Sequence, residues 1–409
     1  ASGHASGGST VRVALVCGTY APERDGVADY VRRLADELRA ADPATDVVVA
    51  ARADDLGSAS SGAVAVTPDW SPRNVRRAAR ALDALDADVV HVQWAPSAYG
   101  WSGAVGWLPA LLRTPVVTTL HEHGWWAWPG RVPPRLWSLV ERRGRYDRES
   151  GLLGPRSRAL LVTNEGHAAT VRARLHREPT LVPIGPNVPG PSPDATGARN
   201  RVRHGVRTRL GLADGVPLLV FFGFVHPVKG VRELIDATAL LRDAGVDVHV
   251  EVAGGFASLA LPGEEARSFR AEVERRIADR GVGDRVRLTG WVDGDEVSEL
   301  LSAADAVVLP FTAGVTTKSG SLLAALEHGA PVLATVADAP DPELVDGATV
   351  LDVTARRDPG AIAASIRRLL DDPALAATVA RGGQQLVARR SWPTIAATHR
   401  AVYASALGS

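Results

Sequence analysis

The chain lacks several features that mark secreted and membrane-spanning proteins. It contains one cysteine, Cys17, so no disulfide bond can form within it, and this composition is typical of a reducing compartment. No apolar run approaches the ~18–20 residues that a membrane-spanning helix needs. Methionine is absent, which excludes nothing about the fold. Residues 1–10 are small and polar and lack the apolar segment of a signal peptide, so we expect a disordered tail and a cytoplasmic protein.

Charge of either sign is not in excess. Lysine and arginine together number 46, as do aspartate and glutamate, so the formal net charge is zero. Nucleic-acid binding depends on an excess of basic side chains, and we therefore expect no nucleic-acid partner. The 45% of hydrophobic and 22% of charged residues are typical of a globular protein. Because one core supports roughly 250–300 residues, a chain of 409 residues is predicted to form two domains or more.

What the sequence does contain is an alternation of short apolar runs with amphipathic stretches. In the first half, the strand-like runs are residues 11–16, 47–50, 64–66, 88–92, 115–120, 159–163 and 180–183. In the second half, they are residues 218–222, 248–253, 286–289, 306–309 and 331–334. Helical stretches separate most of these runs, and this alternation predicts parallel strands joined by crossover helices. The predicted fold class is α/β, with two doubly wound, Rossmann-like sheets.

A stretch rich in proline, glycine and small polar residues, residues 183–196, divides the two halves. The predicted organisation is a first domain over residues 11–190, a linker over 191–212, a second domain over 213–385 and a C-terminal helix over 386–409 that returns to the first domain. Ligands of doubly wound sheets bind beyond the carboxyl ends of the strands. Two such domains facing each other would form a cleft, where small-molecule sites tend to lie.

Glycines in the loops between strands and helices let the backbone approach an anion, and a helix start offers free N–H groups to it. The first such loop, CGTYAPERDGVA (17–28), places Gly26 at a helix start, although an ordinary turn explains it equally well. The loop is not G-x-G-x-x-G, so a dinucleotide site is not predicted. The second loop, FFGFVHPVKG (221–230), places Gly223, His226 and Lys229 before a helix. The charge of Lys229 and the positive end of the helix dipole would then act on the same anion. The alternative is that Lys229 simply faces solvent, as most lysines do.

The third loop leads into a helix at residues 319–327. Gly320, Ser321 and Leu322 would offer backbone N–H groups at its start. Glu327 lies two turns later, on a helix that is otherwise apolar. A buried carboxylate needs a partner. Ribose hydroxyl groups would be one such partner, and a salt bridge or an exposed edge is the alternative.

These loops occur in the order and spacing of a known family. The first-half segments are ADVVHVQW (87–94), PVVTTLHEHG (115–124) and VPIGPNV (182–188). The second-half segments are FFGFVHPVKG, VAGG (252–255), VRLTGWV (286–292) and GSLLAALEHGAPVLAT (320–335). Over nearly its whole length the sequence resembles the retaining glycosyltransferases of family 4, which have the GT-B fold. The resemblance implies transfer of a sugar from a GDP- or UDP-linked donor with retention of configuration.

The resemblance also implies roles for individual residues. His121 and Glu122 would lie near the reacting carbon and Lys229 at the diphosphate, and these are the candidate catalytic residues. The implied donor-binding residues are Gly26, Gly223, His226, Lys229, Gly254, Lys318, Ser319, Gly320, Ser321, Leu322 and Glu327. Two positions depart from the family pattern. Ser319 replaces the first glutamate of the E-x7-E motif, and Phe224 replaces an arginine, whose positive charge His226 or Lys318 would supply.

Seven of the ten tryptophans lie between positions 94 and 137. Aromatic rings stack on sugars and attract cations, so Trp94, Trp125, Trp126 and Trp128 are candidates for an acceptor pocket. Packing in the core is the alternative for each ring. A membrane-facing surface is a further alternative, for which the arginine-rich stretch 134–148 is the candidate amphipathic helix.

The sequence thus predicts a glycosyltransferase with a nucleotide-sugar co-substrate, a small polar or cationic acceptor, and no cofactor. The resemblance implies no metal, and the His121-Glu122-His123 tract is only a weak metal motif. A nucleotide-sugar epimerase of the same fold and a lipid- or polysaccharide-directed glycosyltransferase at a membrane surface are alternatives. The missing dinucleotide motif disfavours a dehydrogenase, and the missing signal peptide disfavours an exported binding protein.

Overall fold

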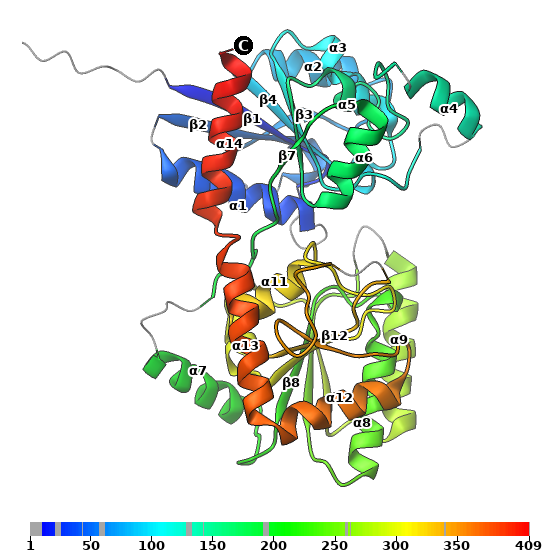
Figure 1. The fold of residues 1–409 in the computed structure, drawn as a ribbon, viewed down its shortest axis with the longest axis vertical. Coiled ribbons are helices and arrows are strands. Elements are labelled where there is room, and N and C mark those ends of the chain that lie inside the picture. Colours follow the sequence, from blue (N-terminus) through cyan, green and yellow to red (C-terminus); the bar gives the residue numbers. More distant parts are fainter. Residues whose placement is uncertain are drawn as a thin grey trace, which may run out of the picture. The chain divides into compact units, whose positions relative to one another are not determined.

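The computed structural model describes residues 10–20, 26–42, 44–56, 62–127, 133–141, 143–190, 196–257, 261, 263–338 and 341–408. The chain forms two compact units (Figure 1). The first unit combines Ala1–Pro183 with Trp392–Ser409, and the second is the continuous segment Ile184–Ser391. Each unit is an α/β structure built on its own parallel sheet, as the alternation of strands and helices predicts.

The first unit contains a seven-stranded sheet in the order β3-β2-β1-β4-β5-β6-β7. Its strands are β1 (Val11–Cys17), β2 (Thr45–Arg52), β3 (Ala63–Thr67), β4 (Val89–Trp94), β5 (Val116–Leu120), β6 (Ala159–Val162) and β7 (Thr180–Leu181). All neighbouring pairs are parallel. Every residue of β4 and β5 is buried. Such burial on both faces explains why these strands read as nearly continuous apolar runs.

Helices cover this sheet. The α-helices are α1 (Gly26–Ala41), α2 (Val75–Asp83), α3 (Leu108–Leu111), α4 (Pro134–Glu141), α5 (Leu153–Arg156), α6 (Glu165–Leu175) and α14 (Trp392–Leu407), with 3-10 turns η1 (Ala53–Asp55), η2 (Pro96–Tyr99) and η3 (Gly103–Trp107). Figure 1 shows α14, in red, beside α1. Arg400 of α14 donates to Asp42 at 2.7 Å. The predicted return of the C-terminal helix to the first domain is confirmed.

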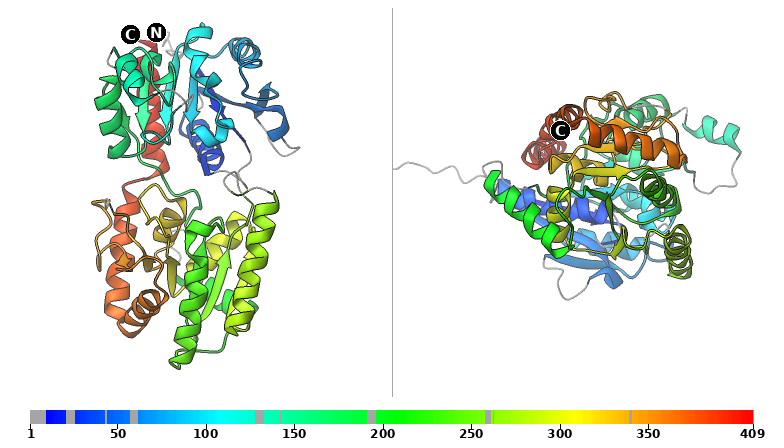
Figure 2. Two further views of the ribbon diagram at one scale, coloured as in Figure 1. Left: turned by 90° about the vertical axis from the view of Figure 1, so that its right-hand side faces the viewer. Right: turned by 90° about the horizontal axis from the view of Figure 1, so that it is seen from below.

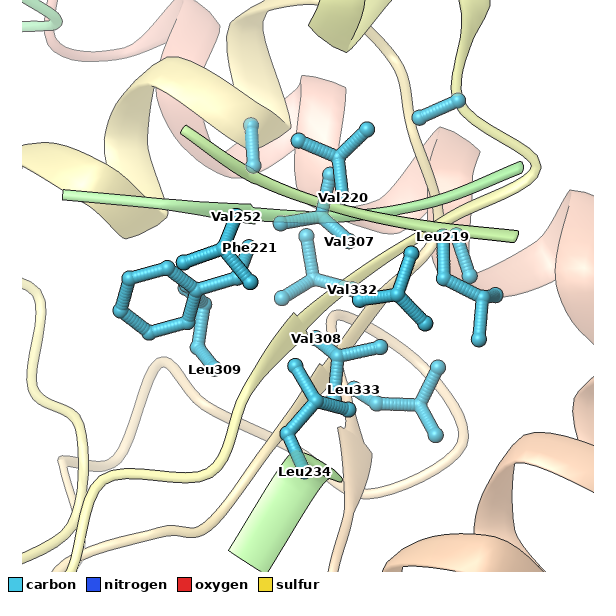
Figure 3. Close-up of a cluster of buried hydrophobic side chains, with 14 of the residues drawn as sticks. Leu219, Val220, Phe221, Leu234, Val252, Val307, Val308, Leu309, Val332 and Leu333 are labelled. Carbon is cyan, nitrogen blue, oxygen red and sulfur yellow. The ribbon is translucent and has the colours of Figure 1, made fainter. Parts of the chain in front are cut away.

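The second unit contains a six-stranded sheet in the order β10-β9-β8-β11-β12-β13. Its strands are β8 (Leu218–Phe222), β9 (His249–Ala253), β10 (Val286–Gly290), β11 (Ala306–Leu309), β12 (Val332–Ala334) and β13 (Leu351–Asp352). Figure 3 shows Val220, Val307 and Val308 among the buried side chains of its core, with Leu234 beside Val308 and Leu333. The strand order reverses between β8 and β11, which is the place where doubly wound sheets bind ligands.

The helices of the second unit lie on both faces of its sheet (Figure 2). They are α7 (Thr196–Arg209), α8 (Val231–Asp243), α9 (Gly263–Arg280), α10 (Gly294–Ala303), α11 (Gly320–Glu327), α12 (Pro359–Asp371) and α13 (Pro373–Ala388), with the 3-10 turn η4 (Pro227–Lys229). Helix α8 packs against α9 and α12, whereas α10 packs against α7 and α11 against α13. The helices that connect the strands of one half of the sheet therefore lie on the face opposite to those that connect the strands of the other half.

The predicted domain boundaries need correction. The segment 191–212 was expected to be a linker, but most of it is helix α7, which belongs to the second unit. Arginines hold this polar helix in place, because Arg203 donates to the carbonyl of Ala303 at 2.9 Å and also pairs with Asp305. The first unit ends at Pro183 rather than at residue 190, and residues 386–391 belong to the second unit.

In the part of the chain that the structure describes, no helix has the length and apolar character needed to cross a membrane.

Candidate functional site

The loop after β8 carries the candidate anion-binding lysine. Gly230 has a φ of +72°, and a β-carbon there would collide with the carbonyl oxygen of Pro310. The backbone N–H of Thr312 donates to the carbonyl of Val228 at 2.9 Å. The loop that contains η4 therefore lies directly on the loop after β11, and glycine is required for this approach. This contact sets Lys229 beside the second of the two loops.

Lys229 is a partly buried cation without a described counter-ion. Its Nζ lies 3.6 Å from the centre of the Phe311 ring. Burial lowers its pKa to about 8. No carboxylate pairs with it among the residues that the structure describes. Because taking a charge out of water without a partner is costly, an anion bound from solution would stabilise this side chain.

The start of α11 meets the ends of β8 and β9. A β-carbon at Gly223, after β8, would collide with Oγ of Ser321, and one at Gly254, after β9, with the carbonyl of Gly223. Gly320 and Ser321 are the first residues of α11, so their N–H groups have no acceptor within the helix. The predicted residues Gly223, Gly254, Gly320 and Ser321 are thus neighbours. A phosphate at this edge of the sheet would meet N–H groups and the positive end of the helix dipole.

Ser319 acts as the N-cap of α11. Its Oγ accepts the N–H of Leu322 at 3.4 Å. The amide of Leu322, predicted to face a phosphate, is therefore already engaged, and only the two preceding amides keep that role. Lys318 is exposed on the preceding loop, which Asp341 holds by accepting the N–H of Thr317 at 3.1 Å. The serine at position 319, where the family has glutamate, thus supplies the N-cap of α11.

His226 caps η4. Its Nδ1 accepts the N–H of Val228 at 3.3 Å, so the ring of a neutral His226 carries its proton on Nε2. Phe224, where the family has arginine, is half-buried. Whether His226 or Lys318 supplies the charge of the missing arginine stays a prediction.

Glu327 ends α11. Its distance from Gly320 along the helix axis is about 10 Å, at 1.5 Å per residue. A β-carbon at Gly190 would lie 2.9 Å from Cγ of Glu327, so the segment that enters the second unit packs on this side chain. The next residue, His328, bonds Oγ of Ser298 at 2.9 Å, and that hydroxyl donates to the carbonyl of Pro189 at 3.3 Å. The entering segment thereby fixes the end of α11.

Sequence reasoning missed this entering segment as part of the site. Within it, Asn187 has a buried Oδ1 without a hydrogen-bond partner among the described residues. Its Nδ2 lies 4.0 Å from the position that a β-carbon on Gly320 would take. The segment VPIGPNV marked the family resemblance, but nothing in its pattern indicated contact with α11.

Lysine occurs at two positions in the whole chain, 229 and 318. We therefore expect ¹³C reductive methylation to give two lysine signals, identified by Lys229→Arg and Lys318→Arg variants. The Lys229 signal should titrate near pH 8, and a bound nucleoside diphosphate should move its midpoint upward, because an opposite charge favours the protonated amine. Donor affinity should accordingly weaken as the pH rises above about 8. An unchanged midpoint with nucleotide bound would place the phosphates elsewhere.

In the first unit, the predicted catalytic residues follow β5. His121 is 6% exposed, and its Nε2 lies 2.8 Å from Oε1 of Gln93. Its ring meets Tyr30 of α1 edge-on, with the ring centres 4.9 Å apart. Glu122 is half-buried beside it. Gly26 is exposed at the first residue of α1, while residues 21–25 of its predicted loop lie outside the described residues.

The third residue of the His-Glu-His tract has a structural partner. His123 Nε2 lies 3.1 Å from Oδ2 of Asp147, and both side chains are fully buried. Within the described ranges, no group of three or more His, Cys, Asp and Glu side chains is placed to hold a metal ion. A metal-independent reaction stays a prediction.

The tryptophans divide into exposed and buried rings. Trp125 and Trp101 are 61% and 48% exposed, with ring centres 5.7 Å apart. Trp126 is half-buried and touches Trp101 at 6.0 Å and Trp94 at 6.3 Å. Trp94 was predicted to line the acceptor pocket, but it is fully buried in the core and lies behind Trp126. Trp128 lies outside the described residues.

A pocket of about 270 Å³ lies beside Trp125 and Trp126. It is lined by Gly124, Trp125, Trp126, Ala127, Arg148, Glu149, Thr170 and Arg174. Arg174, which lines the pocket, was not among the predicted residues, because its partners are far away in the sequence. The pocket is a polar hollow with one aromatic wall.

Its floor is a cluster of ion pairs in which two arginines face three carboxylates. Arg174 pairs with three buried carboxylates, those of Glu141, Asp147 and Glu149. Arg148 adds a two-pronged pair with Glu141. Burial would raise the pKa of Asp147, but the hydrogen bond from His123 and the Arg174 charge outweigh it and lower that pKa. Such a floor offers fixed polar groups without a large excess of charge.

Comparisons with known proteins agree with this architecture. The chain matches the family "Glycosyl transferases group 1" over residues 216–372 and the "Glycosyl transferase 4-like domain" over residues 25–187. Together these matches cover most of the chain. The protein therefore belongs to the group 1 glycosyltransferases of family 4, and its two Rossmann-like units form a GT-B fold.

Individual relatives are distant. The chain is 28% identical to a D-inositol 3-phosphate glycosyltransferase from Salinispora arenicola, over 82% of this chain and 72% of that protein. It is 27% identical to a 2-deoxystreptamine glucosyltransferase from Streptomyces kanamyceticus, over 57% of this chain and only 56% of that protein. Among solved structures, HepE from Anabaena in complex with UDP and glucose has a TM-score of 0.70 at 17% identity, covering 97% of this chain and all of that one.

Proposed function

We propose that the protein transfers a glycosyl group from a GDP- or UDP-linked sugar to a small polyhydroxylated acceptor, with retention of configuration and without a metal ion. One observation carries this proposal. Lys229, a partly buried cation without a described counter-ion, stands on the loop after β8, and Gly223 of that loop lies against Ser321 at the start of α11. The diphosphate of a nucleotide sugar would satisfy both the cation and the helix N–H groups.

The chemistry follows from where charge develops. As the bond between the sugar and the diphosphate breaks, negative charge accumulates on the β-phosphate. Lys229 and the amides of Gly320 and Ser321 would stabilise this charge, and groups that are fixed before the bond breaks do so most effectively. Glu327, about 10 Å along α11, would accept hydroxyl groups of the ribose. His121 would contact the sugar near the reacting carbon, and the leaving phosphate itself would take the acceptor proton.

The acceptor is inferred from the pocket of the first unit. The two relatives are named for D-inositol 3-phosphate and 2-deoxystreptamine, which are both rings that carry several polar groups. Trp125 offers an exposed face on which such a ring would stack, and the Arg148, Glu149 and Arg174 floor would bind its substituents. We therefore propose a cyclitol or a related polar ring as the acceptor.

A thermal-shift panel tests the donor site. We expect one of UDP, GDP, ADP and dTDP to raise the melting temperature, because a ligand that binds the folded state stabilises it by mass action. A Lys229→Met variant should lose most of this shift. If no nucleotide stabilises the protein, the donor site is wrong. Incubation with the matching nucleotide sugar but no acceptor separates the epimerase alternative, which would isomerise the sugar.

A second candidate function, transfer at a membrane surface, has one specific observation in its favour. Helix α4 exposes Leu136, Leu139 and Val140, at 53%, 60% and 43%, with the exposed Arg135 and Arg143 nearby. Exposed apolar side chains with basic neighbours are typical of helices that lie on anionic lipid. Cosedimentation with anionic and with neutral vesicles distinguishes this candidate from a water-soluble acceptor.

A further inference from the structure

A chain of buried hydrogen bonds runs from His121 across the first unit to the C-terminal helix. His121 Nε2 lies 2.8 Å from Oε1 of Gln93. The amide nitrogen of Gln93 lies 3.1 Å from Nε2 of His91. Nδ1 of His91 lies 2.7 Å from the hydroxyl of Tyr403. This series of hydrogen bonds therefore joins β4, the residue that follows β5, and α14 through four polar side chains.

These side chains are almost completely shielded from water. His91 and Gln93 are 0% exposed and Tyr403 is 2% exposed. Thr119, which is 1% exposed, places its hydroxyl 2.8 Å from Nε2 of His91. A buried polar group that loses its partner costs about 1–3 kcal/mol, so each bond holds its neighbours in one orientation. Polar groups of this kind are not needed to fill a core between β-strands, which apolar residues fill elsewhere in the sheet.

The chemistry of the amide sets the protons. The carbonyl oxygen of Gln93 can only accept, so Nε2 of His121 must carry a proton. The amide nitrogen of Gln93 can only donate, so Nε2 of His91 accepts and Nδ1 of His91 donates to Tyr403. Burial, together with the neighbouring His399 and His121, lowers the pKa of His91 well below its usual value, so His91 stays neutral. Rotating the Gln93 amide by 180° would reverse every donor and give His121 the other tautomer.

We propose that Gln93, held by His91 and Tyr403, is a positioning residue that fixes His121 in the tautomer with its proton on Nε2. The ring is held against Tyr30 at the same time, so both its orientation and its hydrogen-bonding pattern are set before a substrate binds. Nδ1 is then the accepting nitrogen of the ring. The relevance of this tautomer to sugar transfer rests on the proposed function, in which His121 contacts the donor sugar.

Long-range ¹H–¹⁵N spectra of the full chain, labelled with ¹⁵N-histidine, test the tautomer directly. The His121 signals are those that disappear in a His121→Asn variant. We expect the pattern of an Nε2-protonated neutral ring in the wild type, and a mixture of tautomers in Gln93→Leu. Tyr403→Phe, which removes one hydroxyl, should give a smaller shift in the same direction and serves as the second test if Gln93→Leu does not fold.

Thr118→Val is the matched control. Like Thr119, Thr118 is a fully buried threonine of β5. Its hydroxyl bonds Ser157 at 2.8 Å and takes no part in the series of hydrogen bonds that reaches His121. This variant should leave the His121 tautomer unchanged. An Nδ1-protonated or doubly protonated His121 in the wild type overturns the proposal. So does a Gln93→Leu or Tyr403→Phe spectrum in which His121 is unaltered.

Kinetics separate positioning from stability. Gln93→Leu should lower kcat by up to about a hundredfold, the cost of a misplaced reacting group, while the donor KM changes little. A variant that is merely less stable would keep the kcat of its folded fraction. The spectra need no turnover, so a confirmed tautomer in a protein that transfers no sugar would refute the proposed function and leave the positioning role intact.

Discussion

Replacing Lys229 with methionine is expected to lower kcat/KM for the sugar donor by about a hundredfold to a thousandfold, the usual effect of removing one preplaced electrostatic group. Methionine keeps the length of the side chain and its contact with Phe311, so the loss should be one of charge and not of packing. Lys229→Arg should recover part of the activity, because arginine restores the positive charge. The recovery should be incomplete, because the planar guanidinium is larger than the compact ammonium of lysine. Steady-state kinetics and calorimetry with the nucleoside diphosphate measure both effects.

The control for this variant is Arg270→Met. Arg270 also places its cation over an aromatic ring of the second unit, 5.7 Å from the centre of Phe256, but its side chain is 53% exposed on α9. It should leave donor kinetics within about twofold of the wild type, as surface substitutions usually do. If Lys229→Met behaves like Arg270→Met, Lys229 does not bind the diphosphate and the donor site must be reassigned.

Replacing Glu327 with alanine is expected to raise the donor KM by about tenfold to a hundredfold, which corresponds to the loss of a hydrogen bond to a charged group. Glu327→Gln should fall between alanine and the wild type, since it retains the contact with Gly190 and one accepting oxygen. Glu299→Ala, which removes a 46%-exposed carboxylate of α10, is the control. Donor titrations measure the effect, and a Glu327→Ala protein that fails to fold would make Glu327 a structural residue.

The sequence predicts the second unit well because local pattern and tertiary structure agree there. Strand β8 occupies the predicted residues 218–222, and α11 begins one residue after its predicted start. Both elements are bounded by glycine loops whose conformations only glycine adopts easily, as at Gly230. The arrangement of Gly223, Gly254 and Ser321 at one edge follows from parallel strands with adjacent carboxyl ends.

Helix α7 could not be recognised because its stability is not local. Its sequence is dominated by arginine and small residues, and among its side chains whose burial the structure describes Val206 is the one fully buried apolar one. The interactions that hold it join residues about a hundred positions apart, such as Arg203 with Asp305. No periodicity within a short window contains that information.

The candidate site of the first unit was only partly predictable for a similar reason. The richness in tryptophan was visible, but composition does not separate Trp94, which is fully buried, from Trp125, which is 61% exposed. The ion cluster beneath the pocket joins Glu141 and Asp147, which precede β6 in the sequence, to Arg174, which follows it. Which of these charges meet depends on the packing of α6, which the pattern of one segment does not determine.

The return of α14 to the first unit has a consequence for the order in which the protein is completed. During synthesis the chain leaves the ribosome from its N-terminus, so the continuous segment Ile184–Ser391 emerges whole before α14 does. The second unit can therefore reach its native state while the first still lacks Tyr403 and the other side chains of its last helix. His91 lacks its hydrogen bond to Tyr403 until then. The region around His121 is therefore completed only after the whole second unit has emerged.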